Sequence, residues 1–208
     1  AGCPPHGSAR AGSDVLFIRH AGALRASPDA GQPQVASDLA MARIFDDGVV
    51  PADIDAATGE VRDLEVHAYY VDNSSSFAAD MPSLRRLTLI KGGVVEDQEM
   101  ITGVENLQVQ FGLDTNGDGH VERYVDPDSP ALTPGASGYL EGARIVAVRL
   151  WLLVRSEESP GAAVRDTHSY QPLDGPAAAI TPGNDAYPAQ FQRVEVTKTI
   201  LLRNEVAR

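Results

Sequence analysis

The chain has 208 residues, which suits one domain and is long enough to bury a core without a disulfide or a metal. Its 29 acidic side chains outnumber 17 basic ones, so the formal net charge is −12 and phosphate backbones are poor partners. The single cysteine, Cys3, excludes an intrachain disulfide but not a bond to a cysteine outside this sequence. No apolar run reaches the roughly 18 residues of a membrane span, and because the sequence starts at Ala1 we expect a processed product or a fragment.

The first quarter of the chain has mixed signals. Residues 1–13 are rich in small residues, Gly and Pro, which predicts an irregular segment. Residues 14–20 (DVLFIRH) form a short apolar run typical of a strand. Ser37 is a candidate cap for a short helix ending at Phe45, because the apolar residues of this segment fall near one side of a helix.

Most of the remaining chain alternates apolar and polar residues. This period of two indicates half-buried antiparallel strands. The alternating segments are 64–70, 87–89, 107–113 and 193–202.

Residues 144–155 (RIVAVRLWLLVR) are apolar on both sides of the predicted strand, which indicates a central strand buried on both faces. One face is unbroken, and the other carries Ile145, Ala147, Trp151 and Leu153, interrupted by Arg149. Either a loop or the segment around Ser37 covers this second face, or a helix that precedes the present sequence does. The second alternative makes those four side chains a helix-packing surface that is partly exposed here or covered only by loop.

These elements predict an α+β fold dominated by an antiparallel sheet. We expect a single globular domain over residues 14–208. A Pro- and Gly-containing loop at about 157–190 separates the last two strands, and a loop of that length is usually functional or disordered.

The sharpest local motif is an acidic turn at residues 114–122 (DTNGDGHVE). Asp114, Asn116 and Asp118 have the spacing of the first ligands in a calcium loop, and Gly119 stands where such a loop turns sharply. The further candidate ligands are His120 through its carbonyl, Glu122, and Asp126 in place of the missing twelfth-position acid. An Asp- and Gly-rich hairpin turn without metal explains the same pattern equally well. Calcium is thus the one cofactor that the sequence suggests.

No other pattern indicates chemistry. The five histidines are dispersed, and His67 with Glu65 is best explained as a solvated surface pair. The chain has no phosphate-binding glycine motif and no nucleophile motif, so we expect neither an enzyme nor a small-molecule substrate.

An ordered set of segments resembles PilW-type minor pilins of type IV pili. Residues 103–114 (GVENLQVQFGLD), followed by the acidic turn and Arg123-Tyr124, are similar to that family's central strand and turn. The other similar segments are 13–19 (SDVLFIR), 69–71 (YYV) with 82–86 (PSLRR), 146–156 (VAVRLWLLVRS) and 193–204 (RVEVTKTILLRN).

The resemblance implies a pilin-like domain that lacks its N-terminal helix, the first half of which anchors in the inner membrane. It implies a periplasmic domain that reaches the pilus or cell surface after assembly. It also implies a structural role in initiating pilus assembly, near the tip, with other minor pilins as partners and a tip-associated adhesin as a further candidate partner. Cys3 would then follow the helix directly. Two alternatives stay open: a minor pseudopilin of type II secretion, and a calcium-dependent extracellular binding or adhesion module.

Overall fold

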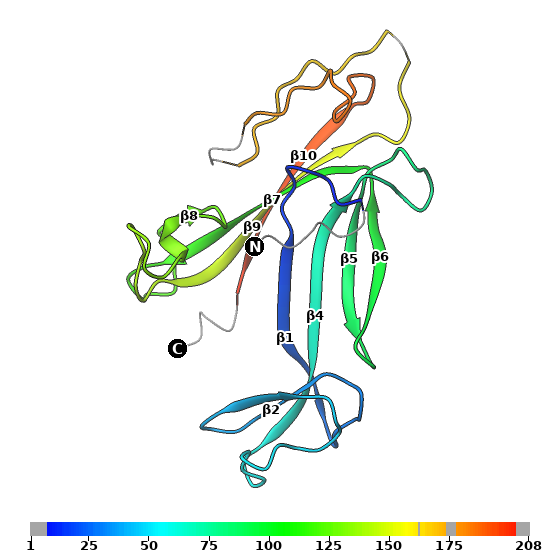
Figure 1. The fold of residues 1–208 in the computed structure, drawn as a ribbon. Helices are drawn as coiled ribbons and strands as arrows, with labels where there is room; N and C mark the ends of the chain where they lie inside the picture. Colours follow the sequence, from blue (N-terminus) through cyan, green and yellow to red (C-terminus); the bar gives the residue numbers. More distant parts are fainter. Residues whose placement is uncertain (1–7, 162, 174–177, 203–208) are drawn as a thin grey trace. The chain divides into compact units, whose positions relative to one another are not determined.

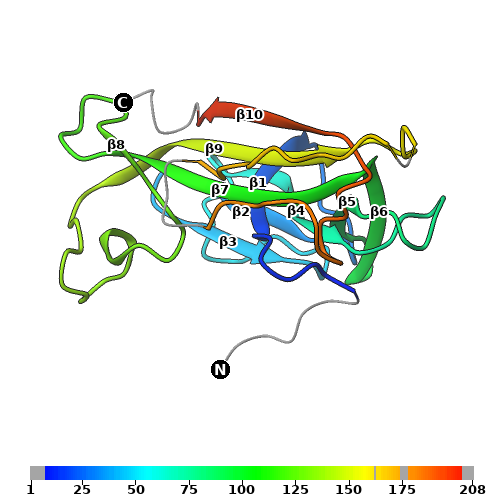
Figure 2. The same cartoon turned by 90° about the horizontal axis from the view of Figure 1, so that it is seen from above.

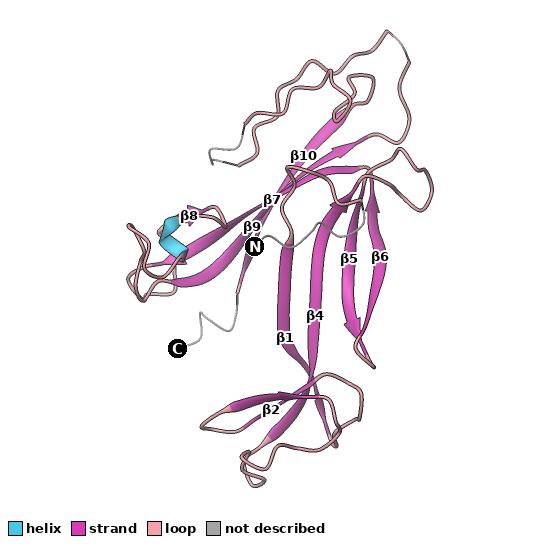
Figure 3. Cartoon of the chain, viewed as in Figure 1, coloured by secondary structure: helices cyan, strands magenta, loops and turns pink. Residues whose placement is uncertain are grey.

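The computed structural model describes residues 8–161, 163–173 and 178–202. Within these residues the chain forms ten strands, and the one helical element is the 3-10 turn Pro130–Leu132 (Figure 1, Figure 3). The expected α+β class is therefore wrong, because the regular secondary structure of the described residues is almost entirely antiparallel strand. None of its described residues forms a helix long and apolar enough to cross a membrane. Cys3 lies outside the described residues.

The helix expected from Ser37 to Phe45 is replaced by a hairpin of β2 (Gln34–Ser37) and β3 (Ala42–Phe45). Asp38 causes the change, because its Oδ1 accepts hydrogen bonds from the backbone amides of Ala40 and Met41 at 2.8 Å each. Such side-chain-to-backbone bonds close a tight turn and compete with a helix. The helical periodicity of this segment was therefore coincidental, and Leu39 at the tip of the turn is 93% exposed.

The chain divides into two compact units. Unit 1 takes its described residues from 8–14, 71–84 and 101–202, and unit 2 consists of residues 15–70 and 85–100. Strands β4 (Glu60–Asp72), β5 (Ser83–Ile90) and β6 (Val94–Thr102) contribute residues to both units. Whether residues 14–208 fold as the expected single domain stays a prediction.

The sheet of unit 2 centres on the long strand β4. Its order is β3-β2-β4-β5-β6, and β1 (Leu16–Arg25) pairs antiparallel with β4. β1 also confirms the strand expected at residues 14–20 and extends it. Between β5 and β6 the chain reverses at Gly92 and Gly93, whose φ angles of 83° and 72° suit the tight hairpin turns that only glycine adopts readily.

The sheet of unit 1 has the order β10-β9-β7-β8 and is antiparallel throughout. The strands are β7 (Val104–Asp114), β8 (Arg123–Val125), β9 (Arg144–Arg155) and β10 (Arg193–Leu201). β9 runs between β7 and β10 (Figure 2), which confirms the central position expected from its apolar sequence. The acidic turn joins β7 to β8 as the expected hairpin.

Two apolar clusters lie in the core of unit 1 among its described residues. Leu113, Val125 and Ala131 make the first, against which Ile145 packs. Trp151, Leu153 and Tyr170 make the second, together with half-buried residues of the 157–190 loop. The loop is therefore part of the core in its described residues.

Candidate functional site

In its described residues, the loop at 157–190 covers one face of β9 at Trp151 and Leu153. Tyr170 and Ile180 exchange two backbone hydrogen bonds, of 2.9 and 2.8 Å, which hold two parts of the loop together. Tyr170 then lies on Trp151 and Leu153, which are 2% and 0% exposed. The loop side chains Leu173, Ile180 and Tyr187 pack against this cluster. Of the two explanations for the second face of β9, the loop is the one that the structure bears out.

A buried charge network fixes the loop to the sheet. Glu105 of β7 is fully buried and accepts two hydrogen bonds from Arg193 of β10, to Oε2 at 2.5 Å and to Oε1 at 3.0 Å. Arg193 Nη1 donates to Asp166 of the loop at 3.1 Å, and the Tyr170 hydroxyl donates to the same carboxylate oxygen at 3.0 Å. A bidentate pair such as Arg193 with Glu105 is among the strongest hydrogen-bonded ion pairs in proteins. Three segments far apart in sequence therefore meet at one guanidinium.

The electrostatics of the network favour a charged Arg193 and a neutral Tyr170. Desolvation alone would lower the pKa of Arg193, but its hydrogen bonds to Glu105 and Asp166 outweigh burial and raise the pKa. Burial raises the pKa of Tyr170 to about 12, with a further contribution from the hydrogen bond to Asp166. A polar pocket beside the network is lined in part by Thr167, His168 and Gln192. The network is suited to holding structure, because Arg193, Asp166 and Tyr170 already bind one another.

The other face of β9 continues onto β10 as an apolar surface open to solvent. Register places Val154 opposite Val194, Leu152 opposite Val196 and Val148 opposite Ile200. The β9 side chains are half-buried, whereas the three β10 side chains are 56%, 44% and 44% exposed. We call these residues, with Leu150, the open strip. Lys198 of β10 stands opposite Leu150 on the same face and interrupts the apolar row. Exposed apolar side chains gathered on one face mark a site of interaction.

The acidic turn has its own internal hydrogen bonds. The Asp114 carboxylate accepts the backbone amides of Asn116, Gly117 and Gly119 at 3.1, 2.6 and 2.9 Å. Desolvation would raise the pKa of Asp114, but these amide hydrogen bonds outweigh it and lower the pKa below the usual value. Glu122 accepts from the amide and the hydroxyl of Thr115.

The structure brings together three of the six predicted calcium ligands. One carboxylate oxygen each from Asp114, Asp118 and Glu122 lies within 4.8 Å of the others. Asn116 offers its side-chain oxygen to the amide of Asp118, and the amide of His120 donates to Asp118. Asp126 is bonded instead to Gln110 of β7 at 2.9 Å. The turn is stabilised without a cation, as the hairpin interpretation requires, and calcium binding stays a prediction.

The four residues expected to contact a missing helix pack within the chain itself. Ala147, Trp151 and Leu153 are buried, and half-buried Ile145 lies against the Leu113 cluster. The helix-packing explanation expected these side chains to be partly exposed or covered only by loop. Because residues of this chain cover them, their burial gives no support to a helix-packing role. The open strip on the opposite side of β9 is the better candidate surface.

Sequence reasoning missed the Glu105–Arg193 pair. The two residues are 88 positions apart; Arg193 falls on the polar side of its strand pattern, whereas Glu105 precedes the alternating segment 107–113. The sequence contains no spacing signal for the pair, because only the register of β7, β9 and β10 brings these side chains together.

Comparison with known proteins gives one match. The family model described as PilW, Type IV Pilus-assembly protein W, matches residues 68–204, which is more than half of the chain. The chain belongs to the PilW family. No curated protein and no solved structure matches it.

The PilW match covers the features described for unit 1. It begins within β4 and runs past the end of β10, so that the buried network, the open strip and the acidic turn all lie inside it. Strands β1, β2 and β3 lie outside it. The resemblance noted in segments 69–71, 82–86, 103–114, 146–156 and 193–204 is thereby confirmed at the level of the PilW family.

Proposed function

We propose that this PilW-family chain is a structural minor pilin, which helps to initiate type IV pilus assembly in a tip complex with other minor pilins. The observation that carries the proposal is the open strip, which stands on a strand pair inside the PilW match. Val194, Val196 and Ile200 are too exposed to contribute fully to the core of this chain. Apolar side chains gathered in this way are stabilised by a protein surface that covers them.

The proposed occupant of the strip is an apolar helix that precedes residue 1, with neighbouring minor pilins beside it. A helix with one apolar stripe fits a flat sheet face, because both present rows of side chains. The proposal includes that the chain is the periplasmic part of a protein anchored in the inner membrane and that it stands on the pilus after assembly. The role is structural rather than enzymatic.

The test is a pair of substitutions on one strand. Val196→Asp places a charge on the open strip, and Thr197→Asp places the same charge on the opposite face of β10, where the side chain is also exposed. Neither change buries a carboxylate, so the two variant proteins should fold and should have similar melting temperatures. In a strain deleted for the gene, full-length wild type and Thr197→Asp should restore surface pili, whereas Val196→Asp should not.

Two results would contradict the proposal. Surface pili at wild-type levels with Val196→Asp would show that the strip is not an assembly surface. Normal pili in the deletion strain, together with loss of type II secretion, would favour the pseudopilin alternative. Two measurements on the same cultures separate these outcomes. An immunoblot quantifies pilin in the sheared surface fraction, and an assay of a secreted substrate reports type II secretion.

A further inference from the structure

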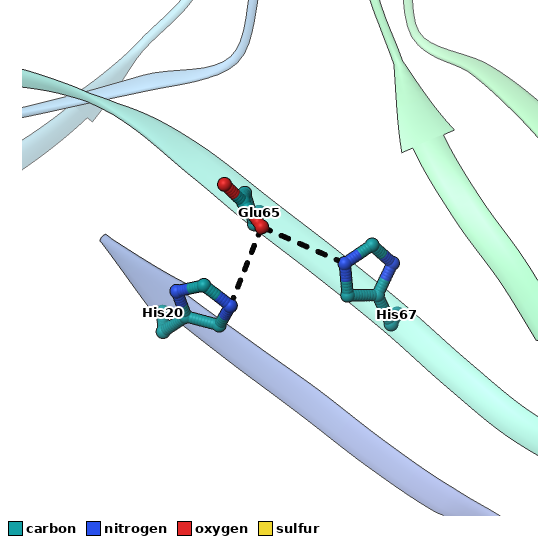
Figure 4. A group of neighbouring side chains, drawn as sticks. All are labelled: His20, Glu65 and His67. Atoms are coloured by element: carbon teal, nitrogen blue, oxygen red, sulfur yellow. Dashed lines mark ion pairs between the residues drawn. The ribbon is translucent and has the colours of Figure 1, made fainter. Parts of the chain in front are cut away.

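A second group of possible metal ligands lies in unit 2, outside both the PilW match and the acidic turn. His20 of β1 stands directly opposite Glu65 of β4 in the strand register. Glu65 and His67 are two positions apart, so they project from the same face of β4. One ligand atom from each of the three residues lies within 4.8 Å of the others. Figure 4 shows the two rings turned toward the carboxylate that lies between them.

The two distances from the imidazoles to the carboxylate are close to those within a coordination shell. Nε2 of His20 is 3.4 Å from Oε2 of Glu65, and Nε2 of His67 is 3.7 Å from the same oxygen. Two atoms bound to one tetrahedral zinc ion at about 2.1 Å lie about 3.4 Å apart. With all three ligand atoms within 4.8 Å of one another, small side-chain movements would bring them around one ion.

The outer hydrogen bonds orient both rings. His20 Nδ1 lies 3.2 Å from the carbonyl oxygen of Ala21, which accepts a hydrogen bond in the tautomer that carries its proton on Nδ1. His67 Nδ1 lies 3.1 Å from the hydroxyl of Thr88, which can accept. Histidine ligands of metals are oriented in this way, with one nitrogen bonded to an outer group and the other free to coordinate.

The backbone leaves room for the carboxylate. A Cβ built on Gly22 of β1 would overlap Oε1 of Glu65, so the absence of a side chain at this position permits the observed place of Glu65. The side chains of His20 and Glu65 are 48% and 45% exposed, and that of His67 is 16% exposed. An ion can therefore reach the cluster from solvent and keep a water ligand.

We propose that His20, Glu65 and His67 form a binding site for a divalent transition-metal ion, with zinc as the best match. Two imidazoles and one carboxylate are typical zinc ligands and leave a fourth position open. Calcium prefers all-oxygen sites, so it does not compete here. The bound ion joins β1 to β4 through side chains as well as through the backbone ladder.

Calorimetric titration with zinc chloride tests the proposal, on metal-free protein from which any affinity tag has been removed. We expect one zinc ion per chain at neutral pH, with binding weakened at about pH 5.5 because the imidazoles must lose their protons to coordinate. His20→Ala, His67→Ala and Glu65→Gln should each lower zinc affinity by about tenfold or more. Gly22→Ala should also weaken binding by displacing Glu65.

Matched controls make the result decisive. His168→Ala removes an exposed histidine from another part of the chain, and Asp118→Ala removes an acid of the acidic turn; both should bind zinc as wild type does. Cobalt(II) provides a second readout, since its visible absorption reports tetrahedral coordination and should disappear in His67→Ala. Folding of each variant is checked by circular dichroism.

Three results would overturn the proposal. The first is the absence of saturable binding in wild type at millimolar zinc. The second is unchanged affinity in folded His20→Ala and His67→Ala proteins, which would leave a solvated ion pair as the explanation of the cluster. The third is loss of binding in Asp118→Ala or His168→Ala, which would place the zinc ion elsewhere.

Discussion

Units 1 and 2 are both antiparallel β structures, but they bury different side chains. Unit 1 buries large apolar residues such as Trp151, Leu153 and Leu113, and it also contains a fully buried ion pair. Unit 2 has few buried apolar residues, and its buried positions include Gln34 and Asp63. A sheet with little apolar core depends on its backbone ladder and on polar contacts between neighbouring strands. The comparison indicates that unit 1 supplies most of the stability, whereas unit 2 is held together by polar contacts.

The largest expected effect comes from the ion pair of unit 1. Glu105→Ala leaves the Arg193 guanidinium buried without its principal partner, which costs about 3–5 kcal/mol. Urea unfolding followed by tryptophan fluorescence measures the loss, since Trp151 is the single tryptophan and lies in the neighbouring cluster. Glu195→Ala on exposed β10 is the control and should change stability by less than about 0.5 kcal/mol. Equal effects of the two changes would mean that the buried pair is unimportant to unit 1.

The next effect comes from the apolar core beneath the loop. Leu153→Ala should destabilise by about 3 kcal/mol, because the side chain is fully buried and the change leaves a cavity. Leu201→Ala removes the same atoms from a side chain that is 64% exposed and should cost less than about 0.5 kcal/mol. If Leu153→Ala proved as mild as its control, the loop would not be a true cover for β9.

Unit 2 should respond to loss of a polar contact. Asp63 accepts hydrogen bonds from Arg25 and from buried Gln34, and Asp63→Asn should cost about 1 kcal/mol. The hydrogen bond from Arg25 lowers the pKa of Asp63, so this stabilisation is present above the ordinary Asp pKa near 4 and is lost as pH falls through the lower folded value. Hydrogen exchange should show the loss in β2 and β4 while unit 1 stays protected. Uniform loss across both units would break the distinction between them.

The smallest expected effect is that of calcium. The Asp114 carboxylate already accepts three backbone amides, so addition of a chelator should leave the melting temperature unchanged. Asp114→Asn should lower it at neutral pH. The difference should shrink in acid, because a carboxylate with a lowered pKa stabilises only while it is ionised. A rise in melting temperature with millimolar calcium, absent in Asp118→Ala, would instead establish a calcium site.

The sequence predicted what depends on local pattern. Period-two alternation located the main strands, and the two apolar faces of residues 144–155 predicted that β9 is central. The acidic turn was recognised as a hairpin candidate because Asp side chains accept hydrogen bonds from nearby backbone amides and Gly adopts the φ angles of tight turns.

Contacts that depend on register were beyond sequence reasoning. His20 joins Glu65 only because β1 and β4 pair in one particular alignment, and Arg193 reaches Glu105 across β9. The predicted helix at 37–45 failed for a related reason, since its apolar spacing fits a helix and a hairpin alike. Asp38 decides between them through two hydrogen bonds.

Strand β10 has a consequence for how the protein behaves as a purified sample. It pairs with β9 along one side and ends the sheet of unit 1, so its other side presents backbone donors and acceptors to solvent. Such a strand can recruit a second copy and start aggregation. Lys198 in the middle of β10 and a net charge of −12 oppose that association at neutral pH. Mild acid removes the repulsion as the carboxylates become protonated, and high salt screens it, so handling the protein near neutral pH and at low ionic strength should keep it monodisperse.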